Sequence, residues 1–225
     1  MSELKHIQLF VAGDSTAASY PDHEAPMAGW GQLLQEYFQE EARVFNVAKC
    51  GATTQSFIDS GRLKTIEDNI REGDYLFVQF GHNDQKPRGT LADSTYKENL
   101  LKFIQVARKK KAIPILLTSV NRRKFDENGK QVHTLAEFPQ ATRDLAKMED
   151  LTCIDLLEKT RILYEGLGIE DSKSLFCIFD KGEQSNYPDG LDDNTHFCED
   201  GAKKVAGLVV EGIREQLPEL AKYLK

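Results

Sequence analysis

Short apolar runs alternate with segments of helical periodicity along nearly the whole of this 225-residue chain. Each run has the length of a strand that is buried on both faces, and each helical segment gathers its apolar residues on one stripe. Strands and helices that alternate in this way form a parallel sheet covered by helices on both faces. We therefore predict an α/β fold, organised as a single domain over residues 1–225.

The central sheet is expected to contain five strands. The predicted strands are residues 7–12, 44–48, 75–80, 113–120 and 152–155. The predicted helices are residues 30–41, 63–71, 95–110, 138–148, 156–167 and 201–217. Between these elements, residues 122–137 and 170–189 are long and polar for loops, and such loops often carry functional residues.

The composition argues against some classes of partner. The net charge is −7 and the isoelectric point is about 5.3, so the charge balance favours neither nucleic acid nor an anionic membrane. The four cysteines form no C-x-x-C pair, and we expect free thiols in a reducing compartment. The amino-terminal residues do not resemble a signal peptide, and no segment reaches transmembrane length. We therefore expect a cytoplasmic protein without a nucleic-acid or membrane partner.

Polar and glycine-containing segments follow three of the predicted strands. Residues 13–15 (Gly-Asp-Ser) follow the first strand, residues 49–54 follow the second, and residues 81–84 (Gly-His-Asn-Asp) follow the third. Ligands of open α/β sheets bind outside the carboxyl ends of the strands. We therefore expect these three segments to converge on one pocket.

One loop near the carboxyl terminus has the spacing Asp-x-x-His. Asp193 and His196 precede the last predicted helix, which can place them over the same edge of the sheet. A serine hydroxyl needs a base to accept its proton, and that base needs a partner to orient it. We therefore predict a hydrolytic triad in which Ser15 attacks, His196 transfers the proton and Asp193 orients the imidazole.

The same chemistry needs hydrogen-bond donors aimed at the negative oxygen of the tetrahedral intermediate. The candidates are the backbone N–H groups of Ser15 and Gly51 and the side-chain amide of Asn83. A glycine at position 51 lets the backbone approach a substrate closely, and an asparagine donates without carrying a charge that must be desolvated. The sequence thus predicts an oxyanion hole from three separate segments.

Each of these segments also has an ordinary structural interpretation. Gly-Asp-Ser is a common turn or helix cap, Gly51 can be a turn glycine, Asp193 can cap a loop and His196 can begin a helix. Four unrelated turns would not be expected to place a nucleophile, a base, an orienting acid and two donors at strand ends. The joint pattern therefore favours the functional interpretation. Asp14 is expected to brace the serine loop, and Trp30 is expected in the core rather than in a sugar platform.

The order and setting of Ser15, Gly51, Asn83 and His196 resemble the sequence blocks of the SGNH (GDSL-type) hydrolases. The resemblance extends over nearly the whole chain. It implies a flavodoxin-like three-layer α/β/α sandwich and a serine mechanism that uses no metal. The G-x-S-x-G elbow of the usual α/β-hydrolase arrangement is absent from the sequence.

A departure from the GDSL pattern points to one branch of that superfamily. Thr16 stands where the GDSL name has a leucine, and Ala17-Ala18 follows it. Together with Thr195 and Phe197 around the histidine, this pattern resembles the rhamnogalacturonan acetylesterase branch (carbohydrate esterase family 12). The resemblance implies a carboxylic-ester hydrolase that removes O-acetyl groups from pectic oligosaccharides through an acetyl-enzyme intermediate.

Six further residues are candidates for substrate binding. Basic side chains lie in the loops after the third and fourth strands, and we predict that they form a rim for galacturonate carboxylates. A solvated run of charges is the structural alternative. Tyr187 lies in a polar loop and can stack on a sugar, and His82 can line the pocket or serve only its loop. The basic candidates are Lys86, Arg88, Arg122 and Arg123.

Two other functions stay open at this point. The same machinery can act on a lipid or a thioester, although the polar loops do not suggest an extended apolar groove. A flavodoxin-like module that binds a mononucleotide is the non-enzymatic alternative, and the absence of G-x-G-x-x-G and G-x-x-x-x-G-K-[ST] disfavours it. No H-E-x-x-H motif or histidine cluster indicates a metal-dependent deacetylase. We expect neither a metal nor a cofactor.

Overall fold

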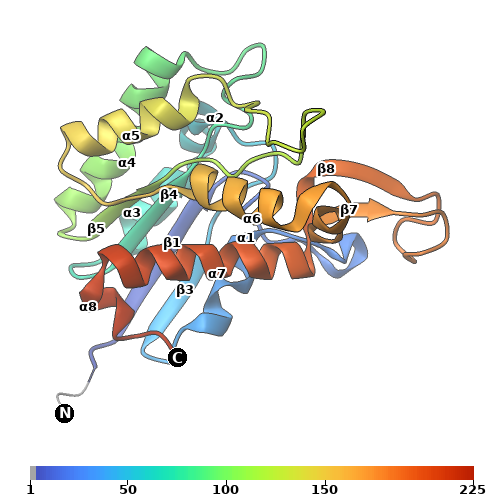
Figure 1. The fold of residues 1–225 in the computed structure, drawn as a ribbon. Coiled ribbons are helices and arrows are strands. Elements are labelled where there is room, and N and C mark those ends of the chain that lie inside the picture. Colours follow the sequence, from blue (N-terminus) through green and yellow to red (C-terminus); the bar gives the residue numbers. More distant parts are fainter. Residues whose placement is uncertain (1–3) are drawn as a thin grey trace.

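A five-stranded parallel sheet forms the centre of the computed structural model, which describes residues 4–225 (Figure 1). The strand order is β3-β1-β4-β5-β6, and every neighbouring pair is parallel. The strands are β1 (Ile7–Gly13), β3 (Ala42–Asn46), β4 (Tyr75–Gln79), β5 (Ile113–Leu117) and β6 (Cys153–Ile154). The predicted α/β fold with a five-stranded central sheet is confirmed.

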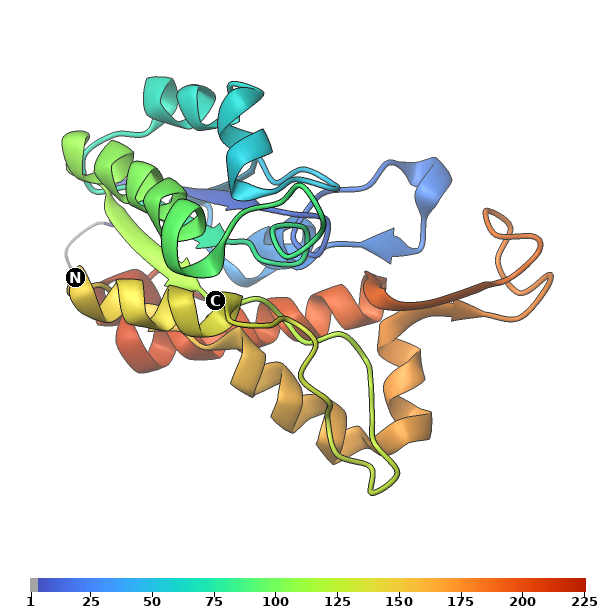
Figure 2. The ribbon, with the colours of Figure 1, turned by 90° about the horizontal axis from the view of Figure 1, so that it is seen from above.

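Helices cover both faces of this sheet and complete the three layers (Figures 1 and 2). Adjacent residues of β1 enter different apolar clusters, Leu9 on one face and Phe10 on the other, because side chains alternate along a strand. The cluster that contains Leu9 also receives side chains from α1 (Trp30–Leu33), α6 (Leu156–Asp171), α7 (Glu199–Gln216) and α8 (Pro218–Ala221). The other receives side chains from α2 (Thr54–Asp59), α3 (Arg62–Asn69), α4 (Lys97–Lys109) and α5 (Phe138–Met148).

A second, antiparallel sheet lies beyond the carboxyl edge of the first, where its β7–β8 hairpin projects from the body (Figure 2). Its order is β2-β8-β7, from β2 (Met27–Ala28), β8 (Leu191–Cys198) and β7 (Phe176–Phe179). The segments 170–189 and 190–196, expected as loops, therefore contain strands. Strand propensity did not indicate β8 because Asp and Asn are depleted in strands, and its pairing with β7 and β2 is tertiary.

The first predicted helix, residues 30–41, is wrong in its second half. The α-helix ends at Leu33, and a 3₁₀ turn over Leu34–Tyr37 follows. The turn brings the Gln35 amide against the open edge of β3, where Gln35 Nε2 donates to Ala42 O (3.1 Å) and Gln35 Oε1 accepts from Val44 N (2.8 Å). These bonds satisfy backbone groups of an edge strand, which outweighs continuation of the helix.

None of the helices within residues 4–225 combines the length and the apolar content needed to cross a membrane.

Candidate active site

Ser15 lies in a tight turn just past the carboxyl end of β1. The chain moves outward from β1 to β3 and then back across to β4, and ligands of open α/β sheets bind at such a reversal. The backbone N–H groups of Ala17 (3.2 Å) and Ala18 (3.1 Å) donate to Asp14 O and close the turn. A side chain on Gly13 would lie 2.9 Å from Gln79 O, so glycine lets the turn pack against β4. Ser15 keeps 8% of its surface exposed.

A chain of hydrogen bonds between buried side chains holds this turn in place. Asp14 Oδ1 accepts from Thr16 N (3.0 Å) and Thr16 Oγ1 (2.8 Å). Thr16 Oγ1 in turn accepts from Gln79 Nε2 (2.8 Å), and Gln79 Oε1 accepts from Trp30 Nε1 (2.6 Å). Burial raises the pKa of Asp14, and the bonds from Thr16 oppose that rise. Thr16 fits this chain because its hydroxyl both donates and accepts, which a leucine cannot do.

His196 and Asp193 reach Ser15 from strand β8. His196 Nε2 lies 2.9 Å from Ser15 Oγ, across 181 positions of sequence, and His196 Nδ1 lies 2.6 Å from Asp193 Oδ2. The other carboxylate oxygen accepts from the backbone N–H of Thr195 (2.8 Å) and His196 (3.0 Å). Burial would raise the pKa of Asp193, but the bonds from His196 outweigh it and lower that pKa. A carboxylate at Nδ1 keeps the proton there, so Nε2 can accept the hydroxyl proton.

Two sets of contacts fix the strand that carries the histidine. The antiparallel pairs Met27–Cys198 and Ala28–Phe197 join β8 to β2. Arg123 supplies the second set: its backbone N–H donates to Asn194 O (2.8 Å) and its Nη1 donates to Asn194 Oδ1 (2.7 Å). The predicted rim residue Arg123 therefore has its guanidinium engaged inside the protein, where Nε also donates to Ser172 Oγ (3.0 Å) and Nη2 donates to Ile169 O.

The predicted oxyanion donors lie on loops that contact each other. Gly51 has φ of +73°, and a Cβ at that position would meet no atom within 4 Å. The glycine is therefore not required by packing, and its backbone is open to a ligand. Asn83 is 6% exposed, and its Nδ2 donates to Ala52 O (3.1 Å), which joins the loop after β4 to the loop after β3.

Asp84, for which no role was predicted, ties the same two loops together with more hydrogen bonds than Asn83. Its Oδ1 accepts from Thr54 N (3.0 Å) and Thr54 Oγ1 (2.7 Å) at the start of α2, and from Thr90 Oγ1 (2.9 Å). Asp84 is fully buried, and this burial raises its pKa while the threonine bonds oppose the rise. Its position directly after Asn83 in the Gly-His-Asn-Asp segment was the available signal.

Comparison with known proteins shows the family of this chain. Residues 11–204 match the model of the GDSL-like Lipase/Acylhydrolase family. The chain belongs to the GDSL-like lipase/acylhydrolase family. As a member it is a carboxylic-ester hydrolase, so the alternative of a mononucleotide-binding module without catalysis is wrong.

Individual relatives of this GDSL-like hydrolase come from Bacillus subtilis (strain 168). The rhamnogalacturonan acetylesterase RhgT is 56% identical over 94% of this chain and 91% of the relative. The probable rhamnogalacturonan acetylesterase YesY is 37% identical over 92% of each chain. The crystal structure of the Bacillus subtilis protein YxiM superposes with a TM-score of 0.82 at 27% identity, over 95% of this chain and 57% of that protein.

The remaining predicted substrate-binding residues have different surroundings in this GDSL-like hydrolase. His82 is buried, its Nε2 lies 3.0 Å from Val120 O, and burial together with the nearby Arg122 lowers its pKa to about 3. The neutral imidazole therefore donates from Nε2 to the carbonyl. Tyr187 donates through its hydroxyl to Glu24 O (2.7 Å), which pins the β7–β8 hairpin to the segment before β2.

The other basic candidates also differ in their surroundings: two of them donate hydrogen bonds within the protein, and the third is exposed to solvent. Lys86 Nζ donates to Asn83 Oδ1 (2.6 Å). Arg122 donates from Nη1 to Thr134 O (3.2 Å) and from Nη2 to His82 O (3.3 Å). Arg88 is exposed, with φ of +71°.

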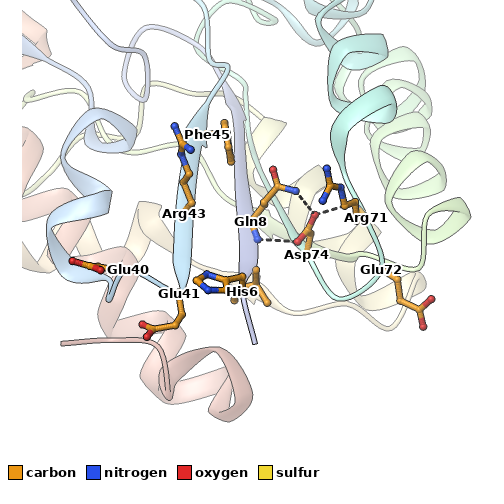
Figure 3. A pocket seen from close by; sticks show the side chains of 10 residues that line it. His6, Gln8, Glu40, Glu41, Arg43, Phe45, Arg71, Glu72 and Asp74 are labelled. Atoms are coloured by element: carbon orange, nitrogen blue, oxygen red, sulfur yellow. Dashed lines mark hydrogen bonds between the residues drawn. The ribbon is translucent and has the colours of Figure 1, made fainter. Parts of the chain in front are cut away.

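A hollow of about 410 Å³ lies at the opposite end of the strands from Ser15. Figure 3 shows the side chains that line it. Its lining comes from the starts of β1 and β3 and from the segment before β4, and includes Arg43 and Arg71. Asp74 in this hollow is engaged, since its carboxylate accepts from Gln8 N (2.8 Å) and Arg71 N (2.8 Å). Because its lining residues lie at the amino ends of the strands, this hollow is separate from the site at the carboxyl edge.

Proposed function

We propose that this GDSL-like hydrolase is a serine esterase that removes O-acetyl groups from pectic, rhamnogalacturonan-type oligosaccharides. The observation that carries the proposal is the continuous chain from Ser15 Oγ through the His196 imidazole to Asp193, with separations of 2.9 and 2.6 Å. In this proposal Ser15 is the nucleophile, His196 the base and Asp193 the orienting acid. The rhamnogalacturonan acetylesterase RhgT, 56% identical to this chain, supports the substrate class.

The reaction proceeds in two balanced halves. His196 Nε2 accepts the proton of Ser15 while Oγ attacks the acetyl carbonyl carbon, and the carbonyl oxygen becomes negative. The backbone N–H groups of Ser15 and Gly51 and the Asn83 amide donate to that oxygen. The carbon–oxygen bond to the sugar then breaks, and the leaving sugar oxygen takes the proton from His196. This half ends with a free sugar hydroxyl and an acetyl group on Ser15.

Water completes the cycle. His196 accepts a proton from a water molecule, whose oxygen attacks the acetyl-enzyme and forms a second tetrahedral intermediate. When this intermediate breaks down, acetic acid leaves and ionises in water, and Ser15 Oγ recovers its proton from His196. The ionised Asp193 stabilises the imidazolium in both halves. No metal or cofactor takes part in the proposed reaction.

The proposal is tested by the acetate that the protein releases from acetylated rhamnogalacturonan fragments, acetylated xylan, chitin oligomers and nitrophenyl esters of increasing acyl length. We expect kcat/KM for the pectic fragments to exceed that for xylan and chitin by about tenfold or more, which is about 1.4 kcal/mol of transition-state discrimination. Among nitrophenyl esters we expect the acetate to be the best substrate. Faster turnover of a long acyl chain would instead support the lipid or thioester alternative.

Arg122 is the part of the predicted basic rim that we propose for uronate recognition. Arg108, Arg143 and Arg161 pair with carboxylates, whereas no carboxylate of residues 4–225 lies within 4.0 Å of the Arg122 guanidinium. The group is half-buried and donates to the carbonyl of His82, the residue before Asn83. A partly desolvated guanidinium that binds two backbone carbonyls but no carboxylate of the described residues within 4.0 Å suits recognition of a substrate carboxylate.

Arg122→Gln is expected to raise KM for acetylated galacturonate-containing fragments about tenfold, which is the loss of roughly one charge-assisted hydrogen bond. KM for nitrophenyl acetate, which has no carboxylate, is expected to stay the same. Arg71→Gln, which changes an exposed arginine at the other end of the sheet, is the matched control. Equal losses on both substrates would contradict uronate binding and assign Arg122 to the support of the His82 loop.

The four cysteines support a reducing compartment, and cytoplasmic location is part of the proposal. All four lie in the described part of the chain, and all four are free thiols. Burial raises the pKa of Cys153 and Cys177 to about 12, so these thiols stay protonated and unreactive at neutral pH.

A further inference from the structure

The amide of Asn83 is held in one orientation by two partners of opposite character. Its Oδ1 accepts from Lys86 Nζ (2.6 Å), and its Nδ2 donates to Ala52 O (3.1 Å). An ammonium can only donate and a backbone carbonyl can only accept, so both contacts specify the same orientation of the amide. Rotation by 180° would point Nδ2 at an ammonium and Oδ1 at a carbonyl oxygen, and both contacts would then be repulsive.

The orientation matters because of where the second Nδ2 hydrogen goes. Nδ2 carries two hydrogens and Ala52 O takes one, while no other acceptor within residues 4–225 bonds to this nitrogen. The second hydrogen is therefore available to a ligand beside the Gly51–Ala52 segment. A rotated amide would present a lone pair there and repel a developing negative charge.

Lys86 reaches Asn83 through local backbone geometry. The backbone N–H of Lys86 donates to Asn83 O (3.1 Å), which closes a turn and brings the lysine side chain back over the asparagine. Asn83 Oδ1 is the partner that the structure gives to the ammonium, and no carboxylate of residues 4–225 lies within 4.0 Å of it. The charge of Lys86 is thus directed at the amide oxygen, and it polarises the amide so that its N–H becomes a stronger donor.

We propose that Lys86 is a positioning residue of the oxyanion hole, which orients and polarises the Asn83 amide through the hydrogen bond between Nζ and Oδ1. This inference rests on the oxyanion role proposed for Asn83. It differs from the predicted role of Lys86 as a ligand of substrate carboxylates, because it requires an effect on substrates that carry no charge. It also requires that the effect pass through Asn83.

The test is a double-mutant cycle on nitrophenyl acetate, a neutral ester. Asn83→Ala is expected to lower kcat about 100-fold, as for the loss of one oxyanion donor. Lys86→Met is expected to lower kcat about tenfold with KM unchanged, because the interaction strengthens only in the transition state. In the Asn83→Ala background, Lys86→Met is expected to change kcat by less than about twofold, since its target is already absent.

Two conservative variants separate orientation from charge. Lys86→Arg keeps a cationic donor and is expected to recover most of the lost kcat, and Lys86→Gln keeps a neutral donor and is expected to recover an intermediate part. Lys147→Met, the same substitution at an exposed lysine of α5, is the control for surface effects. Circular dichroism and Tm establish that each variant folds, and Lys86→Gln replaces Lys86→Met in the cycle should the latter be unfolded.

Two results would overturn the inference: an unchanged kcat for Lys86→Met on the neutral ester, or a tenfold loss that persists in the Asn83→Ala background. If Lys86→Met leaves kcat on the neutral ester unchanged but weakens the binding of uronate fragments, Lys86 is instead a residue of substrate recognition. Neither result depends on the natural substrate, because the cycle uses nitrophenyl acetate. Failure of the rhamnogalacturonan proposal would appear instead as absent acetate release from pectic fragments by the unmodified protein.

Discussion

Replacement of Ser15 by alanine is expected to lower kcat for nitrophenyl acetate by about 10⁵-fold or more, because no other group can form the acetyl-enzyme. The side chain removed is small, and its Oγ contacts the Nε2 of His196. The turn itself is held by Asp14 and Thr16, whose bonds the substitution leaves in place. Loss of activity is therefore expected without loss of structure.

The measurement for Ser15→Ala is steady-state release of nitrophenol, together with a thermal melt that we expect to shift by no more than about 2 °C. Ser19→Ala is the matched control, because Ser19 is exposed and follows the same strand four residues later. It is expected to keep the activity of the unmodified protein. Substantial turnover by Ser15→Ala would show that a different nucleophile acts and would remove the basis of the esterase mechanism.

Asp193→Asn is expected to lower kcat by about 10³- to 10⁴-fold through the tautomer of His196. The oxygen of the introduced amide would keep the bonds from the backbone N–H of Thr195 and His196, which leaves the NH₂ group of that amide facing His196 Nδ1. Nδ1 must then be the acceptor, and the imidazole proton moves to Nε2. An N–H would point at Ser15 Oγ where a lone pair is needed, so the base can no longer accept a proton.

The pH dependence makes this second prediction sharper. The bonds from His196 hold the pKa of Asp193 below its usual value of 3.8. The side chain therefore carries its negative charge at any pH above that lowered pKa and loses the charge only as the pH falls through it. Protonation of Asp193 is therefore expected to contribute nothing to the pH dependence of the Asp193→Asn deficit above about pH 5. Asp192→Asn, at the exposed neighbour on β8, is the control and should retain activity. A deficit that disappears with rising pH would contradict the tautomer argument.

The convergence of three strand ends could be predicted from the sequence because it follows from topology. A parallel sheet brings the carboxyl ends of its strands to one edge, so Ser15, Gly51 and Asn83 had to emerge on the same side once three strands were recognised. The apolar runs of β1 and β4 are strong signals. The contact of Asn83 with Ala52 was a consequence of β3 and β4 flanking β1.

The surroundings of the charged residues could not be predicted in this way. Arg122 and Arg123 are adjacent and chemically identical, yet the guanidinium of Arg123 binds Asn194 and Ile169 while that of Arg122 binds Thr134 and His82. A side chain that reaches across 71 positions to Asn194 finds its partner only in the folded chain. Local sequence carries no information about such contacts.

The placement of His196 on a strand was also beyond the local pattern. Asp192, Asp193 and Asn194 are typical of turns, and they belong to a strand here because β7 pairs with Asp192 and Asp193 while β2 pairs with the end of the same strand, Phe197 and Cys198. The spacing Asp-x-x-His nevertheless predicted that the two side chains meet, since the required contact is local. The contact between the two side chains could therefore be predicted where the backbone conformation could not.

The two residues of the proton-transfer pair, Ser15 and His196, belong to different sheets, and we expect these two sheets to differ in their resistance to unfolding. Ser15 follows a strand with neighbours on both sides, whereas Asp192 and Asp193, just before His196, pair with β7 alone, and the adjoining Asn194 is held by Arg123. Dilute urea or mild heating will detach the weaker sheet first. Inactivation will then precede melting, and a longer-lived catalyst calls for reinforcement of that attachment rather than of the interior.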